Sequence, residues 1–218
     1  MTDLSYGGDS IPTTTFNNLT EEKKHRIIEA AINELSISSY EHIKLSNIIR
    51  DAKIPRGSFY QYFADKMDLY KYIMSKIADK KVEYLSDKMK NTQNLQLLDL
   101  FRELYISGIK FAIENPKYIM ITELLLSSKG TLYDELMGNN LKLAFDYYKS
   151  CIIRDIEQGY IRDDVDVDTL CELIIDMTLN VTNRQLRDTG EINPKLMLHK
   201  IDSIIKIFKK GIIGEIDV

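Results

Sequence analysis

This chain of 218 residues has few cysteines and no long uncharged apolar run. Its only two cysteines, Cys151 and Cys171, each lie inside a helical apolar pattern, so we predict small buried hydrophobic residues rather than a disulfide. No uncharged apolar run of about 18 residues occurs, and no basic segment followed by an apolar one opens the chain. We therefore expect a soluble, cytoplasmic protein that has no membrane partner.

Histidine is also scarce, and the pattern of what is present does not suggest catalysis. The three histidines, His25, His42 and His199, are far apart and share no ligand-like spacing with the cysteines. No glycine-rich phosphate loop precedes a helix, and no nucleophile elbow appears. We predict that the chain is not an enzyme and holds neither a metal nor a cofactor.

The chain also lacks a strong excess of charge of either sign. Its net charge is −4, whereas residues 21–72 carry nine Lys or Arg against eight Asp or Glu and are therefore at +1. A nucleic-acid-binding face normally shows as a clear basic patch. The charge contrast alone does not predict DNA binding.

Helical periodicity fills almost the whole chain after residues 1–19, a polar stretch that we predict to be a poorly ordered tail. Thr20 is a suitable N-cap for a first helix with Glu21 and Glu22 in its first turn. Further helices are predicted over residues 45–52, 56–63, 66–90, 94–114, 117–128, 132–158, 168–187 and 195–212. The predicted fold is all-α, with a three-helix unit over residues 20–65 and a larger helical bundle over residues 66–218.

The stretch IPRGSFYQYFADK, residues 54–66, crowds four aromatic side chains into one short helix. On a helical wheel Phe59 and Phe63 share one face and Tyr60 and Tyr62 flank it, while the opposite face is small and polar. We expect the Phe rings to anchor the helix and the Tyr hydroxyls to reach outward. An alternative interpretation is that all four aromatics form the core of the small unit.

The polar face of that helix has the chemistry of base recognition. Gln61 can pair bidentately with adenine, and Arg56 can fork onto guanine or a phosphate. Lys66 begins the next helix, where a phosphate would meet both its ammonium group and free backbone N–H groups. Two short helices joined by a tight turn, LSNIIRDAKIPRGSFYQYF, form a helix-turn-helix layout, although some such units bind protein instead.

The stretch IIEAAINELSISSYEHIKLSNIIRDAKIPRGSFYQYFADKMDLYKYI resembles the DNA-binding domain of the tetracycline-repressor (TetR/AcrR) family of bacterial regulators. Its core, GSFYQYFADKMDLY, is similar to the family signature of a small residue, Ser or Thr, an apolar residue, Tyr, any residue, Tyr or His, Phe, two variable residues and Lys. The resemblance implies contacts to DNA bases or backbone for Arg56, Gly57, Ser58, Tyr60 and Gln61. It implies phosphate contacts for Tyr62 and Lys66, and it places Ser46 near the start of the helix that crosses the backbone.

Two residues depart from the family pattern at the turn. Lys53 stands where the family commonly has Gly, so a non-glycine residue is expected at positive φ at a cost of about 1 kcal/mol. Pro55 replaces the common Ser cap, which removes a side-chain cap worth about 1 kcal/mol but fixes φ for the first turn. These departures put the shape of the turn in question and leave the motif in place.

The resemblance further implies a homodimer built through the last two helices and a palindromic operator in double-stranded DNA, with repression as the family's usual mode. The last two helices carry apolar stripes, for which ordinary core packing is the alternative. The predicted interface residues are Leu170, Ile174, Met177, Val181, Met197, Ile201, Ile204, Ile205 and Phe208.

Family members typically bind a small molecule in the larger domain. An apolar or aromatic effector would suit the middle helices, whose candidate contacts are Phe101, Tyr105, Tyr118, Ile121, Phe145 and Tyr148. Each of these could instead fill the core. The alternative function is a helical protein-interaction module whose helix-turn-helix does not read DNA sequence.

Overall fold

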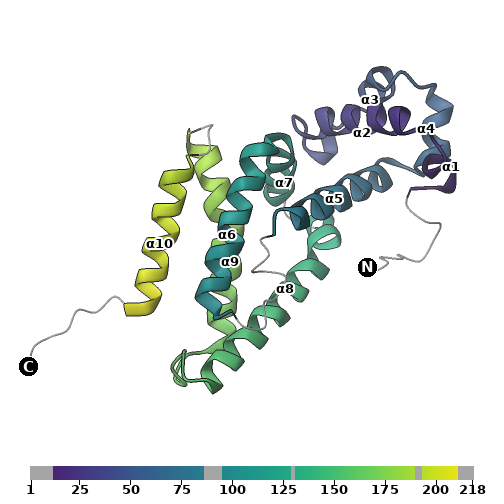
Figure 1. The fold of residues 1–218 in the computed structure, drawn as a ribbon. Coiled ribbons are helices and arrows are strands. Elements are labelled where there is room, and N and C mark those ends of the chain that lie inside the picture. Colours follow the sequence, from purple (N-terminus) through teal and green to yellow (C-terminus); the bar gives the residue numbers. More distant parts are fainter. Residues whose placement is uncertain (1–11, 86–94, 129–130, 190–192, 211–218) are drawn as a thin grey trace, which may run out of the picture. The chain divides into compact units, whose positions relative to one another are not determined.

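The computed structural model describes residues 12–85, 95–128, 131–189 and 193–210, and these ranges contain helices and no strand (Figure 1). The predicted all-α class is thereby confirmed. Helices α6 to α10 begin within a few residues of their predicted starts. In chain order the elements are α1 (Thr14–Asn17), α2 (Glu21–Leu35), the 3₁₀ turn η1 (Tyr40–His42), α3 (Leu45–Asp51), α4 (Arg56–Tyr62), α5 (Lys66–Glu83), α6 (Leu97–Glu114), α7 (Pro116–Ser128), α8 (Thr131–Glu157), α9 (Val167–Thr189) and α10 (Pro194–Lys210).

The described residues divide into two compact units, and the division does not follow the predicted ranges 20–65 and 66–218. The head unit is the described chain up to Lys80 together with Pro116–Leu136, and the body unit is the remainder. Helix α5 therefore contributes most of its length to the head unit, and α7 belongs wholly to it. The helix-turn-helix is thus part of a larger unit than the sequence suggested.

Helix α2 begins as its sequence predicts. Thr20 is the N-cap of α2, and its hydroxyl accepts a hydrogen bond from the backbone N–H of Lys23 at 3.4 Å. Two carboxylates in the first turn, Glu21 and Glu22, complement the helix dipole. Helix α2 buries an apolar stripe against α3, so these two helices form the base on which the rest of the motif packs.

The predicted tail was wrong for residues 12–19. Thr13 caps the short helix α1, and the ring of Phe16 is fully buried. A single aromatic residue in a polar stretch gives no periodic pattern, so its burial depends on partners distant in sequence. The rest of the predicted tail, residues 1–11, lies outside the described residues.

Helix α7 packs against α2 and η1 within the head unit. The ammonium group of Lys117 donates a hydrogen bond to the Asn33 side-chain oxygen at 2.6 Å, which joins the start of α7 to α2. A further link runs from Lys71 of α5 to Glu135 of α8, whose charged atoms lie 2.6 Å apart. The helices that carry the motif are therefore tied to segments that follow it in the chain.

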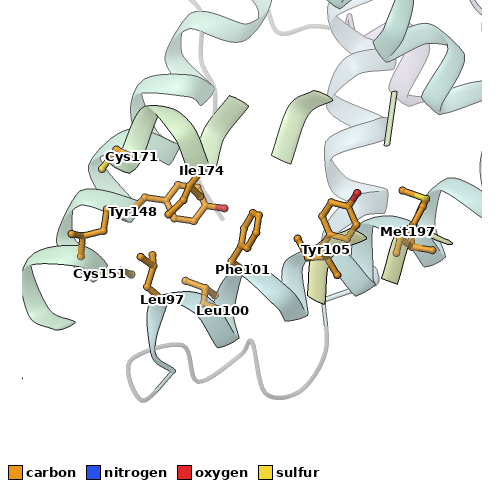
Figure 2. Packing of buried hydrophobic residues seen from close by; sticks show 12 residues of the cluster. Leu97, Leu100, Phe101, Tyr105, Tyr148, Cys151, Cys171, Ile174 and Met197 are labelled. Atoms are coloured by element: carbon orange, nitrogen blue, oxygen red, sulfur yellow. The ribbon is translucent and has the colours of Figure 1, made fainter. Parts of the chain in front are cut away.

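The body unit is built around an apolar cluster contributed by α6, α8, α9 and α10 (Figure 2). Phe101, Tyr148 and Ile174 are buried in it, and Met197 and Ile201 bring α10 onto α6. Outside this cluster, the Arg102 guanidinium reinforces the α6–α10 contact by donating to an Asp202 carboxylate oxygen at 2.8 Å.

One buried carboxylate, Asp155 of α8, organises the start of α6. Its Oδ2 accepts a hydrogen bond from the Leu97 backbone N–H at 2.6 Å, and its Oδ1 accepts one from Arg154 Nη2 at 2.7 Å. The same Arg154 nitrogen donates to the Leu95 carbonyl at 2.5 Å. A helix start leaves backbone N–H groups unsatisfied, so Asp155 supplies from a distant helix the cap that α6 lacks locally.

Breaks between the body helices follow local signals in part. Gly159 ends α8 at φ 75°, a left-handed conformation that favours glycine. The Asn193 side chain accepts a hydrogen bond from the Leu196 N–H at 3.1 Å and so caps α10. The Asn115 amide donates to the Phe111 carbonyl at 2.9 Å and so closes the end of α6.

Both cysteines lie in the body cluster as free, buried thiols, which confirms their prediction as small hydrophobic residues. Among the described residues, no helix is long and apolar enough to cross a membrane. Those same residues contain no group of three or more His, Cys, Asp and Glu side chains that could hold a metal ion.

Candidate nucleic-acid interface

The turn between α3 and α4 places Lys53 at the positive φ that the family resemblance led us to expect. Lys53 is the only described non-glycine residue at positive φ, at 53°. Its N–H donates to the Arg50 carbonyl at 3.0 Å, and the Ile54 N–H donates to the Ile49 carbonyl at 3.2 Å. These bonds hold the turn closed although a lysine in this region costs about 1 kcal/mol relative to glycine.

Pro55 occupies the N-cap position of α4 at φ −62° and makes no side-chain cap. Its carbonyl accepts a hydrogen bond from the Ser58 N–H at 3.0 Å, so the helix begins without a side-chain acceptor. With only seven residues, α4 has little stability of its own. Its order must come from contacts to other elements.

The two faces of α4 divide as the wheel predicted. Phe59 and Phe63 are buried, with ring centroids 5.8 Å apart. Arg56, Gly57 and Gln61 are exposed, while Ser58 is partly exposed. Tyr60 is 49% exposed, and its ring meets that of Phe59 edge-on at 5.3 Å. Ser46 is exposed on α3.

Gly57 is informative because the fold does not require it. A Cβ atom built at this position would meet no heavy atom within 4 Å, and the residue does not adopt a positive φ. A glycine therefore costs helix stability here without relieving any clash inside the chain. The position is suited to close approach by a partner outside the chain.

Tyr62 differs from the prediction that it stands at the edge of the helix with its hydroxyl reaching outward. It is only 3% exposed and packs edge-on against Phe16, with centroids 5.9 Å apart. The Lys23 ammonium lies 5.6 Å from the centre of the same ring. The prediction placed this edge in solvent because it treated residues 12–19 as a tail, whereas those residues cover it.

Lys66 also has a different setting from the predicted one. Its ammonium donates to the Tyr40 carbonyl at 2.6 Å and lies 4.2 Å from the centre of the Tyr40 ring, so it ties α5 to η1. The start of α5 is already capped by Asp65 and Asp68, which accept from the N–H groups of Asp68 and Ala64 at 2.9 Å and 3.1 Å. A phosphate at this helix start would meet two carboxylates.

The tyrosines beside Lys66 are in their neutral form. Tyr40 and Tyr70 pack edge-on at 5.5 Å. Burial raises the pKa of Tyr70 to about 12, with a smaller contribution from Glu41. Burial also raises the pKa of Tyr40, and the carboxylate of Asp65 adds to the effect. The η1 contact is therefore insensitive to tyrosine ionisation near neutral pH.

The sequence reasoning missed Glu34, a buried carboxylate on the apolar stripe of α2. Its oxygens accept hydrogen bonds from the Lys44 N–H and the Asn47 side-chain amide, each at 2.9 Å. Glu34 thereby caps the start of α3, which has no side-chain cap of its own. A carboxylate one turn after Ala31, inside a buried stripe, was the signal that could have revealed it.

The candidate effector residues are divided between the two units. Phe101, Tyr105 and Tyr148 are buried in the body cluster (Figure 2). Phe145 packs partly buried against it. Tyr118 and Ile121 lie on α7 in the head unit instead.

The candidate dimer residues divide in a similar way. Ile174, Met197 and Ile201 are fully buried in the chain's own core, as the core-packing alternative expects. Leu170, Met177, Ile204 and Ile205 pack partly buried against the same body cluster. Partly exposed are Leu170, Met177, Ile204, Ile205 and Phe208. Val181 lies outside the residues whose side chains are described.

The sequence is similar to a known protein family and to individual regulators. Residues 27–73 match the model of the family described as bacterial regulatory proteins, tetR family. The HTH-type transcriptional regulator HbdR of Aromatoleum sp. (strain CIB) is 34% identical over 77 residues, which cover 35% of this chain and only about a third (34%) of that protein.

Solved structures extend the likeness beyond the motif. A TetR family transcriptional regulator from Chloroflexus aurantiacus J-10-FL has a TM-score of 0.74 and 28% identity, covering 93% of this chain and 98% of its own. The regulator FadR from Bacillus subtilis, solved in complex with stearoyl-CoA, has a TM-score of 0.69 and 17% identity, covering 87% of this chain and 99% of its own. At that identity the second likeness concerns the fold alone.

Proposed function

Because the chain belongs to the tetR family of bacterial regulatory proteins, we propose that it is a repressor that binds a palindromic operator as a homodimer and leaves it when a small effector binds. It is a DNA-binding transcription regulator and not an enzyme. The observation that carries the proposal is the division of α4 into a buried Phe face and an exposed face bearing Arg56, Gly57 and Gln61.

The exposed face of α4 is suited to reading bases in a major groove. Gln61 and Arg56 supply bidentate donors and acceptors, and the missing side chain at Gly57 lets the helix approach the DNA. In this proposal, Tyr60, Ser58 and Ser46 contact the DNA backbone next to the bases that are read. Tyr62 and Lys66 have other roles in this proposal, since one is buried and the other is bonded to the Tyr40 carbonyl.

Selection from a pool of random DNA duplexes tests the proposal directly. We expect the purified chain to enrich a sequence with two inverted half-sites about 34 Å apart, one helical turn of DNA. Binding to the enriched site should weaken as salt rises, because phosphate neutralisation releases counterions. If no sequence is enriched and salt has no effect on binding, the protein-interaction module becomes the better description.

For the effector, we propose a molecule with an apolar chain or ring that binds in the body unit. The buried aromatic side chains of Phe101, Tyr105 and Tyr148 support this class, as does the stearoyl-CoA bound to the Bacillus subtilis relative. Stearoyl-CoA should release the protein from its selected DNA, whereas free coenzyme A, which has the same nucleotide but no acyl chain, should not. Release by neither compound would exclude long-chain acyl-CoA.

The proposed dimer uses apolar side chains of α9 and α10 that the monomer leaves exposed. Leu173 is 49% exposed and shares a stripe with Leu170 and Met177, and Ile207 of α10 is 51% exposed. Ile207→Glu should convert a dimer into monomers in sedimentation analysis. Lys206→Glu, an exposed neighbour on another face, is the control for added negative charge. A wild-type monomer would contradict the proposed assembly.

Repression is tested separately from DNA binding. A reporter placed behind the selected site should be expressed more strongly in cells that lack the protein. Lower expression without the protein would instead indicate an activator.

A further inference from the structure

The reading helix α4 ends on hydrogen bonds from a segment far away in the sequence. Helices leave their last carbonyl groups without partners inside the helix. In α4 the Gln61 carbonyl accepts a hydrogen bond from the Thr13 hydroxyl at 2.7 Å, and the Tyr62 carbonyl accepts one from the Thr13 N–H at 3.2 Å. One residue of the N-terminal segment thus satisfies two of the end carbonyls of a helix only seven residues long.

Phe16 of α1 fixes the same end of α4 by packing. Its ring is fully buried against Phe63, Tyr62 and Tyr72, with centroid distances of 5.1, 5.9 and 5.4 Å. Tyr72 belongs to α5, so Phe16 fills a socket with walls from both helices. The crowded aromatic residues of α4 are therefore explained in part by a partner 40 or more residues earlier.

The hydroxyl of Thr13 couples these two contacts. It donates to the Gln61 carbonyl and also accepts from the Phe16 N–H at 3.4 Å, as the N-cap of α1. The Asn17 amide donates to the Pro12 carbonyl at 3.4 Å and closes the segment on itself. Loss of the hydroxyl would weaken both the cap of α1 and the bond to α4.

We propose that residues 13–16 form a positioning element for DNA recognition, with Thr13 as the positioning residue. The element does not touch DNA. It holds the backbone of Gln61, whose side chain is the proposed base reader, so it determines how well that side chain is pre-organised in the groove. The inference rests on the proposed function for its effect on DNA and on the geometry alone for its effect on α4.

The experiment compares Thr13→Val, which keeps the shape and removes the hydroxyl, with Thr13→Ser, which restores it. Thr15→Val makes the same chemical change at an exposed position of α1 and is the matched control. Hydrogen exchange is measured for residues 57–62 of α4, with residues 45–51 of α3 as the internal reference. Affinity is measured for the selected duplex and for a random duplex.

For Thr13→Val we expect exchange in α4 to quicken by about three- to tenfold, the factor for one lost hydrogen bond, with α3 unchanged. The ratio of selected-site to random-site affinity should fall by a similar factor. Thr13→Ser and Thr15→Val should both behave like the wild type.

Two results would overturn the inference. Unchanged exchange in α4 would mean that Thr13 does not order the helix. Faster exchange with unchanged DNA selectivity would mean that this order does not matter for reading. A wild-type chain without any sequence preference is a different outcome, because it removes the proposed function and the role in reading with it, while the exchange result still decides whether Thr13 orders α4.

Discussion

The head unit and the body unit are each stabilised internally, and the interactions that stabilise them differ. In the head unit, the short helices α3 and α4 depend on polar groups from other segments, namely Glu34 at the start of α3 and Thr13 at the end of α4. In the body unit, long helices share an apolar cluster, and Asp155 is the buried carboxylate that joins two of them. The head therefore keeps an exposed polar face on short helices whose ends are capped by residues distant in sequence.

Asp155→Ala should have the largest effect and should act through the body unit. It removes the acceptor of the Leu97 N–H and leaves Arg154 without its carboxylate, so we expect a loss of about 3 kcal/mol in the free energy of unfolding. Denaturant unfolding measures it. Asp155→Asn keeps the shape and one acceptor and should lose less. A loss below about 1 kcal/mol for the alanine variant would contradict the role of this carboxylate.

Gln61→Ala and Arg56→Ala should act only on the head's outer face. Each is expected to cost about 1 to 3 kcal/mol of binding free energy on the selected duplex and little on random DNA. Both side chains are exposed, so the free energy of unfolding should stay the same. Binding titrations of each variant with the selected duplex and with a random duplex measure the two losses. Equal losses on selected and random DNA would remove the base-reading role.

Gly57→Ala should separate stability from function at one position. Alanine meets no neighbour and is a better helix former by up to about 1 kcal/mol, so unfolding should need the same denaturant concentration or slightly more. Affinity for the selected duplex should fall, because the added methyl group holds α4 away from the groove. Full DNA affinity in the alanine variant would show that close approach at this position is not needed.

The smallest effect is expected at the start of α9 in the body unit. Hydrogen bonds from Thr169, first from its backbone N–H, lower the pKa of Asp166. A carboxyl group with a lowered pKa stabilises the folded state above its ordinary pKa near 4, and this contribution is lost as pH falls through the lowered value. Asp166→Asn should retain the cap at neutral pH and flatten the loss of thermal stability at acid pH. If the thermal stability of Asp166→Asn falls at acid pH as steeply as that of the wild type, the prediction is wrong.

Neighbouring residues in the sequence are sufficient to predict much of the helical fold. The uncapped start at Pro55 and the cap at Asn193 each depend on neighbours within a few residues. The positive φ of Lys53 was expected from the family resemblance. The buried pair Phe59 and Phe63 follows from helical spacing. Predictions of this kind require only the period and end chemistry of a helix.

The remainder depends on pairings across long stretches of chain, which one sequence does not reveal. Phe16 gains its socket only when α4 and α5 are in place, and this pairing buries Tyr62. Ile174 lies on an apolar stripe that suits a core and an interface equally well, and only its packing in the body cluster decides between them. Lys66 has an unexpected partner in the carbonyl of Tyr40, a group that no residue pattern identifies.

The length of α4 also bears on how a regulator finds its site in a genome. Seven residues rise about 10 Å along a helix axis, which matches roughly three base-pair steps of 3.4 Å. A given three-base-pair sequence occurs by chance at roughly one in 64 positions. That is far too often to define a single binding site among the millions of competing sites in a chromosome. In the proposed homodimer, two copies of α4 together would read about six base pairs, a sequence expected by chance at roughly one in 4,000 positions.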